Sequence, residues 1–158
     1  MDLLDSSHWG PVWALLNAMD REIASLYDDA GITGVRTRFV GPLIQLSRDE
    51  PMTIQSLATR VKVTHSAMSQ TVSAMRAAGL VVDADNADGR TRRIRLSERG
   101  RSVLPFLTAE WRATETTLRE IEAELPYPLS TVVRDIEAAF ADRPFGERLR
   151  ANLAKELG

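Results

Sequence analysis

Apolar residues recur every three or four positions along most of the chain, and this spacing predicts amphipathic helices. The first helix is expected to begin after Ser6 and Ser7, with Pro11 in its first turn, and to stop near Gly31. Its apolar face comprises Val12, Leu15, Leu16, Met19, Ile23, Leu26 and Tyr27. A second helix is expected at about 35–47, where Pro42 predicts a kink or an early break.

Two short helices with a tight connection are predicted next. Thr53 is the expected N-cap of the first, and Thr64 is that of the second, which runs from about 65 to 78. Gly79 follows, where a left-handed residue would end the helix. Because only residues 61–63 connect the two helices, the pattern predicts a helix-turn-helix.

The pattern then changes to the two-residue period of β-strands. Residues 80–82 are apolar, residues 85–89 are rich in turn formers, and Ile94 and Leu96 alternate with arginines. These segments predict a β-hairpin with an arginine-rich returning strand, which is the wing of a winged helix-turn-helix.

A long helix is expected from about 98 to 125, capped by Ser97 and bent at Pro105. Its apolar residues follow a heptad-like spacing and are Leu104, Leu107, Trp111, Leu118, Ile121 and Leu125. Pro126 and Pro128 end this helix. Two shorter amphipathic segments are expected after them, at about 130–141 and 145–157.

Charge is distributed unevenly along the chain. Residues 51–101 hold nine Arg and Lys against four acidic residues, a net charge of +5. The whole chain carries −2, so the remainder carries −7. A basic middle between acidic flanks is typical of a DNA-binding segment, although a solvated charged surface would give the same pattern.

Several classes of protein are disfavoured by composition. The 158 residues suit a single domain and contain no cysteine, which excludes disulfides and thiolate metal sites within the chain. His8 and His65 are far apart, and no phosphate-binding loop or nucleophile motif occurs. We therefore expect no enzyme activity, no cofactor and no metal site. No stretch approaches the roughly 18 apolar residues of a membrane helix, and the N-terminus lacks a basic secretion signal, so we expect a cytoplasmic protein with no membrane partner.

Between Thr53 and Gly100 the chain carries a set of short motifs. They are Leu57-Ala58, Val63-Thr64, Ser69, Gly79-Leu80-Val81, Asp88-Gly89-Arg90 and Ile94-Arg95-Leu96-Ser97-Glu98-Arg99-Gly100. Together they resemble the MarR family of bacterial transcriptional regulators. The Asp-x-Arg motif, followed closely by Leu-Ser-Glu-Arg-Gly, is the most specific part of this resemblance.

The resemblance implies a mainly α fold with a small β-hairpin wing, a winged helix-turn-helix with N- and C-terminal dimerisation helices. Residues 1–48 and 101–158 would carry the dimerisation helices, and residues 49–100 the DNA-binding region. The protein would be a homodimeric regulator, a repressor, that binds a palindromic operator in double-stranded DNA. Lys62 departs from the family pattern, which usually has glycine there, and acidic Asp83 and Asp85 stand where relatives often carry arginine.

The second helix of a helix-turn-helix lies in the major groove, with its N-terminal residues nearest the bases. Its predicted polar side comprises His65, Ser66, Ser69, Gln70 and Ser73. Gln70 is the best candidate base reader, because its amide can pair with the N6 and N7 edge of adenine. A merely solvated helix face is the alternative, but serine is a mediocre helix former, so folding alone explains three serines poorly.

In the wing, the family resemblance places Arg90 in the minor groove with Asp88 orienting its guanidinium. A narrow A·T minor groove attracts arginine, and a nearby carboxylate can hold the planar fork. The Asp88-Gly89 pair is also a plain hairpin turn, and both roles are compatible. Arg92 and Arg93 are the expected phosphate contacts.

Two alternatives stay open at this stage. A winged helix can serve as a protein–protein interaction adaptor without direct operator binding, although the arginine-rich wing would then lack a purpose. Relatives are often released from DNA by small aromatic ligands, and Trp9, Trp13 and Trp111 could line a ligand pocket. Aromatic residues at helical spacing more often form core.

Overall fold

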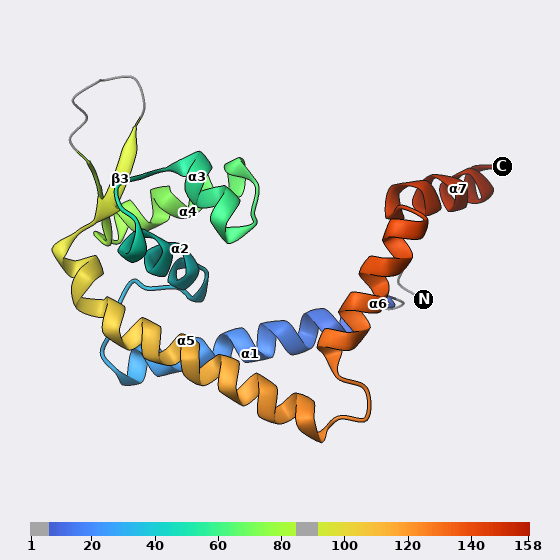
Figure 1. Ribbon diagram of the computed structural model, residues 1–158, viewed down its shortest axis with the longest axis horizontal. Helices are drawn as coiled ribbons and strands as arrows, with labels where there is room; N and C mark the ends of the chain where they lie inside the picture. The colour runs from blue at the N-terminus through green and yellow to red at the C-terminus, as the bar shows by residue number, and fades with distance from the viewer. Residues whose placement is uncertain (1–6, 85–91) are drawn as a thin grey trace. The chain divides into compact units, whose positions relative to one another are not determined.

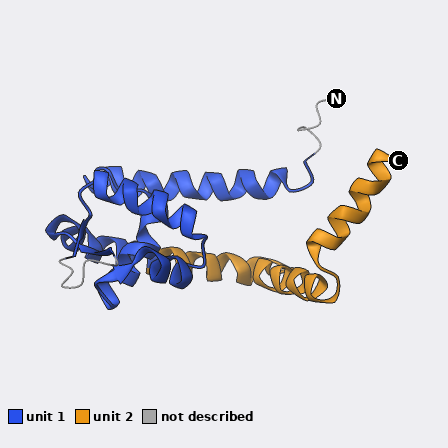
Figure 2. Ribbon diagram, turned by 90° about the horizontal axis from the view of Figure 1, so that it is seen from above, with its two compact units in different colours: residues 1–111 blue, residues 112–158 orange. Residues whose placement is uncertain are grey.

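The computed structural model describes residues 7–84 and 92–158, in two compact units (Figure 2). Unit one comprises residues 1–111 and contains α1 to α4, the sheet and the first part of α5. Unit two comprises residues 112–158 and contains the rest of α5 followed by α6 and α7.

The first two helices follow the sequence pattern closely. α1 spans Gly10–Asp29, and α2 spans Thr37–Arg48. Gly31 follows α1 with φ +67°, the left-handed conformation in which the chain turns away from a helix. Pro11 lies in the first turn as expected, but the helix begins a few residues after Ser7, and its N-cap is Trp9 with no side-chain cap. The early break at Pro42 is wrong, since α2 continues through it to Arg48.

The helix-turn-helix is formed by α3 (Ile54–Val61) and α4 (His65–Ala77). Both predicted caps are confirmed: the Ser56 amide donates to Thr53 Oγ1 at 3.0 Å, and the Ala67 amide donates to Thr64 Oγ1 at 3.2 Å. Such caps satisfy amides that the first helical turn leaves without partners. Gly79, with φ +70°, ends the second helix as expected.

The wing is part of a larger sheet than the sequence predicted. β2 (Val81–Asp83) pairs antiparallel with β3 (Arg93–Leu96), which confirms the two strands of the hairpin. A short strand, β1 (Met52–Thr53), pairs with the other edge of β3, so the sheet has three strands in the order β1-β3-β2. The prediction of a two-stranded wing is therefore corrected.

The core of unit one joins the helix-turn-helix to the sheet. Figure 1 shows α2, α3 and α4 gathered beside the strands. The largest fully buried side chains are Phe39, Leu43, Leu46, Leu57, Met68, Met75, Leu80, Ile94, Leu96 and Leu107. Burying each such side chain contributes about 1.5–3 kcal/mol relative to leaving it in water. The fold is thus mainly helical with a small sheet, a winged helix-turn-helix flanked by longer helices.

The connection between α3 and α4 contains a strained residue. Lys62 has φ 59° and ψ 43°, the left-handed conformation that a side chain with a Cβ disfavours. The next amide, that of Val63, donates to the Ala58 carbonyl at 3.0 Å, which closes the turn around Lys62.

Replacing Lys62 with glycine is expected to raise the free energy of unfolding by about 0.5–1 kcal/mol, because glycine adopts this conformation without steric cost. The gain is reduced by the larger backbone entropy of glycine in the unfolded chain. Urea unfolding checks the prediction. Lys155→Gly, within the helix α7, is the control and should lower stability. A less stable Lys62→Gly variant would show that the lysine side chain makes contacts worth more than the strain.

The remaining helices are long and incompletely covered. α5 runs without interruption over Glu98–Glu124, α6 over Leu129–Asp142 and α7 over Phe145–Leu157. The predicted Ser97 cap is confirmed by a 2.9 Å hydrogen bond from the Gly100 amide to Ser97 Oγ. Among the predicted heptad residues Leu107 is buried, whereas Trp111, Ile121 and Leu125 are exposed. No residue of α6 or α7 is buried within the chain.

Candidate nucleic-acid interface

One side of α4 is polar and open to solvent. His65, Ser66, Gln70 and Ser73 are exposed, and Ser69 is half-buried. The opposite side, formed by Met68, Val72 and Met75, is at most 1% exposed and packs in the core. The five residues predicted from the sequence to form the polar side of this helix thus lie on one face of α4. Their imidazole, hydroxyl and amide groups can all donate and accept hydrogen bonds.

The returning strand of the wing presents arginines on one face. Arg93 and Arg95 are exposed in β3, while Ile94 and Leu96 between and after them are buried. Val82 of β2 lies opposite Arg95 in the register, and Met52 of β1 lies opposite Ile94. Arg92, just before the strand, is also exposed. Asp88 and Arg90, the predicted minor-groove pair, lie outside the described residues.

One of the acidic departures in the wing is compensated within the fold. Asp83, at the end of β2, forms an ion pair with Arg76 of α4. The carboxylate therefore stands beside a guanidinium rather than alone, which reduces its expected repulsion of phosphates. The same pair connects the second helix of the helix-turn-helix to the wing.

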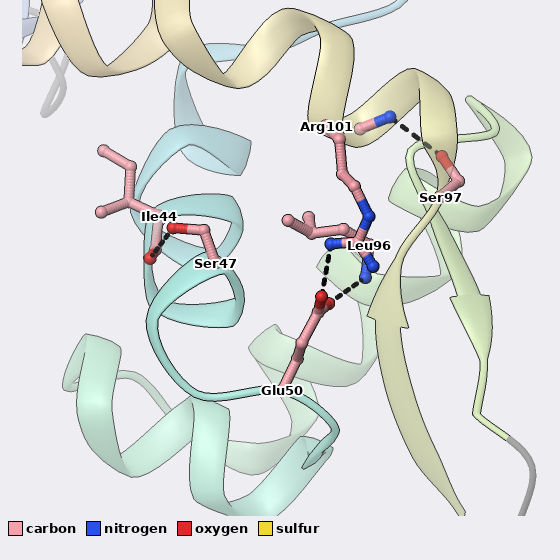
Figure 3. A network of polar contacts seen from close by, with 7 residues as sticks. Ile44, Ser47, Glu50, Leu96, Ser97 and Arg101 are labelled. Carbon is pink, nitrogen blue, oxygen red and sulfur yellow. Dashed lines mark hydrogen bonds and ion pairs between the residues drawn. The ribbon is translucent and has the colours of Figure 1, made fainter.

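A second polar contact holds the base of the wing, and the sequence patterns did not point to it. The Glu50 carboxylate accepts a hydrogen bond from the Leu96 amide at 2.6 Å and pairs with the Arg101 guanidinium (Figure 3). Glu50 precedes β1, Leu96 ends β3, and Arg101 lies in the first turns of α5. One carboxylate thus links three segments that are distant in the sequence.

The predicted aromatic cluster is not part of the core of the chain. Trp9, Trp13 and Trp111 are 49%, 61% and 45% exposed. The single chain therefore does not bury these residues, and a ligand-lining role stays a prediction.

A buried polar pair was missed by the sequence patterns. The Tyr27 hydroxyl donates to Glu110 at 3.2 Å, and both residues are buried. Burial, and then the adjacent Glu110 carboxylate, raise the pKa of the Tyr27 hydroxyl well above its usual value.

Within residues 7–84 and 92–158, no group of three or more His, Asp or Glu side chains is placed to hold a metal ion. Among the helices of this same part of the chain, none combines the length and the apolarity that crossing a membrane requires.

The geometry defines a class of protein, a winged helix-turn-helix with an exposed polar second helix and a basic wing strand. Neither a protein-family model nor a curated protein sequence matches the chain. Solved structures do match its fold.

The regulator MosR from M. tuberculosis, solved in complex with DNA, shares 24% identity at a TM-score of 0.60, over 87% of this chain and 99% of that one. PcaV from Streptomyces coelicolor, solved with its natural ligand, shares 19% identity at a TM-score of 0.59, over 90% and 97% of the two chains. The MarR family regulator SPO1453 from Silicibacter pomeroyi shares 24% identity at a TM-score of 0.52, over 90% and 98%. This chain therefore has the fold of the MarR-type transcriptional regulators.

Proposed function

We propose that this protein is a MarR-type transcriptional repressor that binds a palindromic operator as a homodimer. The observation that carries the proposal is the exposed polar face of α4, opposite a fully buried apolar face. In a helix-turn-helix this second helix enters the major groove. His65, Ser66, Ser69, Gln70 and Ser73 would face the DNA, with Gln70 as the principal base reader.

The wing supports the proposal through its charge. Arg93 and Arg95 project from the exposed face of β3, and Arg92 precedes them. These side chains would contact phosphates, and Arg90, oriented by Asp88, would enter the minor groove. MosR, whose fold this chain shares, was solved on DNA.

The uncovered apolar faces support a homodimer. α6 and α7 expose Leu129, Val132, Val133, Phe140, Phe145, Leu149, Leu153 and Leu157, and α1 with its N-cap exposes Trp9, Trp13, Leu15, Leu16 and Leu26. Apolar surface on this scale marks an interaction site in a soluble protein. In the proposal, residues 1–48 and 101–158 dimerise with those of a second copy, and residues 49–100 bind DNA.

A small aromatic ligand is the proposed release signal. Trp9, Trp13 and Trp111 offer exposed indole surfaces on which such a ligand could stack. PcaV, which shares the fold, was solved with a natural ligand.

The function is tested by selecting binding sites with the purified protein from a random duplex library of roughly 30 base pairs, long enough for two half-sites one turn apart. Fluorescence anisotropy then compares the selected duplex with a scrambled one. We expect a palindromic sequence, two chains per duplex, and an affinity that falls at least about 100-fold between roughly 50 and 200 mM salt.

Arg90→Ala is expected to weaken binding to the selected duplex by about tenfold or more, the loss of one well-placed contact. Arg119→Ala, on the exposed part of α5 in unit two, removes the same charge and is the control. A folded protein that selects no sequence would contradict the proposal and favour the protein–protein adaptor.

A further inference from the structure

Arg99 belongs to the Leu-Ser-Glu-Arg-Gly motif, and the proposed function gives it no role. It lies in the first turn of α5 and makes hydrogen bonds to two other segments. Its Nη1 donates to the Ala78 carbonyl at 2.5 Å, and its Nη2 donates to the Thr33 carbonyl at 2.6 Å. One guanidinium therefore joins the end of α4 to the connection between α1 and α2.

Both acceptors occupy equivalent places in the backbone. Thr33 and Ala78 are each followed by a left-handed glycine, Gly34 with φ +71° and Gly79 with φ +70°. A Cβ on these glycines would lie 3.6 Å and 3.9 Å from the guanidinium nitrogens of Arg99, so the two glycine turns lie against the same side chain. We call this arrangement of Arg99 with the two carbonyls the Arg99 bridge.

The chemistry of the bridge suits an arginine. Ala78 is the C-cap of α4, where carbonyls have no partner within the helix and the helix dipole favours a positive charge. A planar guanidinium can donate in two directions at a fixed angle, which the single nitrogen of lysine does less well. The bridge therefore fixes the position of the α4 end against the α1–α2 connection.

We propose that Arg99 is a positioning residue that sets the orientation of α4 for sequence-specific DNA binding, without touching the DNA. This inference rests on the proposed function. α4 has 13 residues, and Gln70 lies roughly 11 Å from its C-terminal end, so a tilt of roughly 10° about that end moves Gln70 by roughly 2 Å. A base contact by Gln70 does not survive such a shift, whereas attraction to phosphates does.

Arg99→Met tests the inference, because it keeps an unbranched apolar stem and removes every donor. Arg119→Met is the matched control: it removes the same charge from α5, but the hydrogen bonds of Arg119 go to Glu115 and Thr116 of the same helix. Both variants are assayed where circular dichroism shows them fully folded. Affinity is measured for the selected duplex and for its scrambled counterpart.

We expect Arg99→Met to bind the selected duplex at least roughly tenfold more weakly than Arg119→Met, the loss of one base contact. Binding to the scrambled duplex should be equal in the two variants. A merely stabilising arginine would leave the selectivity of the folded protein unchanged. Equal losses in both variants, or no loss in Arg99→Met, would overturn the inference.

Hydrogen exchange without DNA separates this inference from the proposed function. Arg99→Met should speed exchange in both segments 32–35 and 78–80, and Arg119→Met should not. If the wild type selects no DNA sequence, the proposed function fails, and faster exchange in both segments would still establish the bridge. Unchanged exchange in Arg99→Met would overturn the bridge whatever the DNA result.

Discussion

Replacing Gly100 with alanine is expected to lower the free energy of unfolding by about 3 kcal/mol or more, because the new methyl group would collide with the backbone. A Cβ at Gly100 would lie 2.1 Å from the Leu80 carbonyl oxygen and 3.2 Å from its carbon. Side-chain rotation cannot relieve a clash between a Cβ and a carbonyl, so the segments themselves must separate.

That separation would disturb several contacts at once. The Leu80 carbonyl accepts a 3.0 Å hydrogen bond from the Ser97 amide, and the Leu80 side chain is fully buried. Ser97 Oγ donates to the Gly79 carbonyl at 2.6 Å. Moving α5 away from residues 79–80 therefore costs hydrogen bonds and core packing together.

Gly41→Ala is the control for this experiment. Gly41 lies within α2, and a Cβ there would meet only Val61 Cγ1 at an ordinary 3.8 Å. Because alanine favours a helix more than glycine does, this variant should gain up to about 1 kcal/mol. Urea unfolding of both variants at one protein concentration measures the difference. A Gly100→Ala protein as stable as Gly41→Ala would show that α5 shifts at little cost.

The local signals in the sequence predicted the fold well. Thr53, Thr64 and Ser97 each cap the helix that they were expected to cap. A cap involves residues only three apart, so its chemistry is fully visible in the sequence. The alternation of Ile94 and Leu96 with arginines likewise predicted the strand β3 and its buried face.

The missed features depend on residues that are distant in the sequence. β1 has only two residues, too few to show an alternating pattern, and its pairing with β3 depends on the folded position of Met52. Glu50 and Leu96 are 46 residues apart, and Arg99 and Thr33 are 66 apart. No local period identifies such partners, although the motif containing Arg99 marked one end of the bridge.

The candidate site could be predicted only in part, because some of its contacts join residues that are distant in the sequence. The polar face of α4 follows from helical periodicity, and the structure exposes His65, Ser66, Gln70 and Ser73 as that periodicity requires. The residues that orient α4 follow no such period, because they lie in other elements, the first turns of α5 and the end of β2. Arg76 shows this, since only the fold reveals its pairing with Asp83.

The largest effect on DNA binding is expected from Gln70→Glu, which should weaken binding to the selected duplex by about 100-fold or more. An amide can donate to N7 and accept from N6 of adenine, whereas a carboxylate can only accept. Losing a bidentate base contact costs about 1–3 kcal/mol. The new negative charge beside the phosphates adds a further penalty, which should diminish as salt is raised.

Ala77→Glu provides the charge-matched control. Ala77 is exposed and, by helical periodicity, lies on the same face of α4 as Gln70, about two turns further from the N-terminal end. The Ala77→Glu variant should weaken DNA binding far less than Gln70→Glu, because it adds the charge without removing a base contact. Gln70→Ala separates the effect of the lost base contact from that of the added charge, since it removes the contact and adds no charge. If Gln70→Glu and Ala77→Glu weaken binding equally, α4 contributes only charge, and the bases are recognised by other residues.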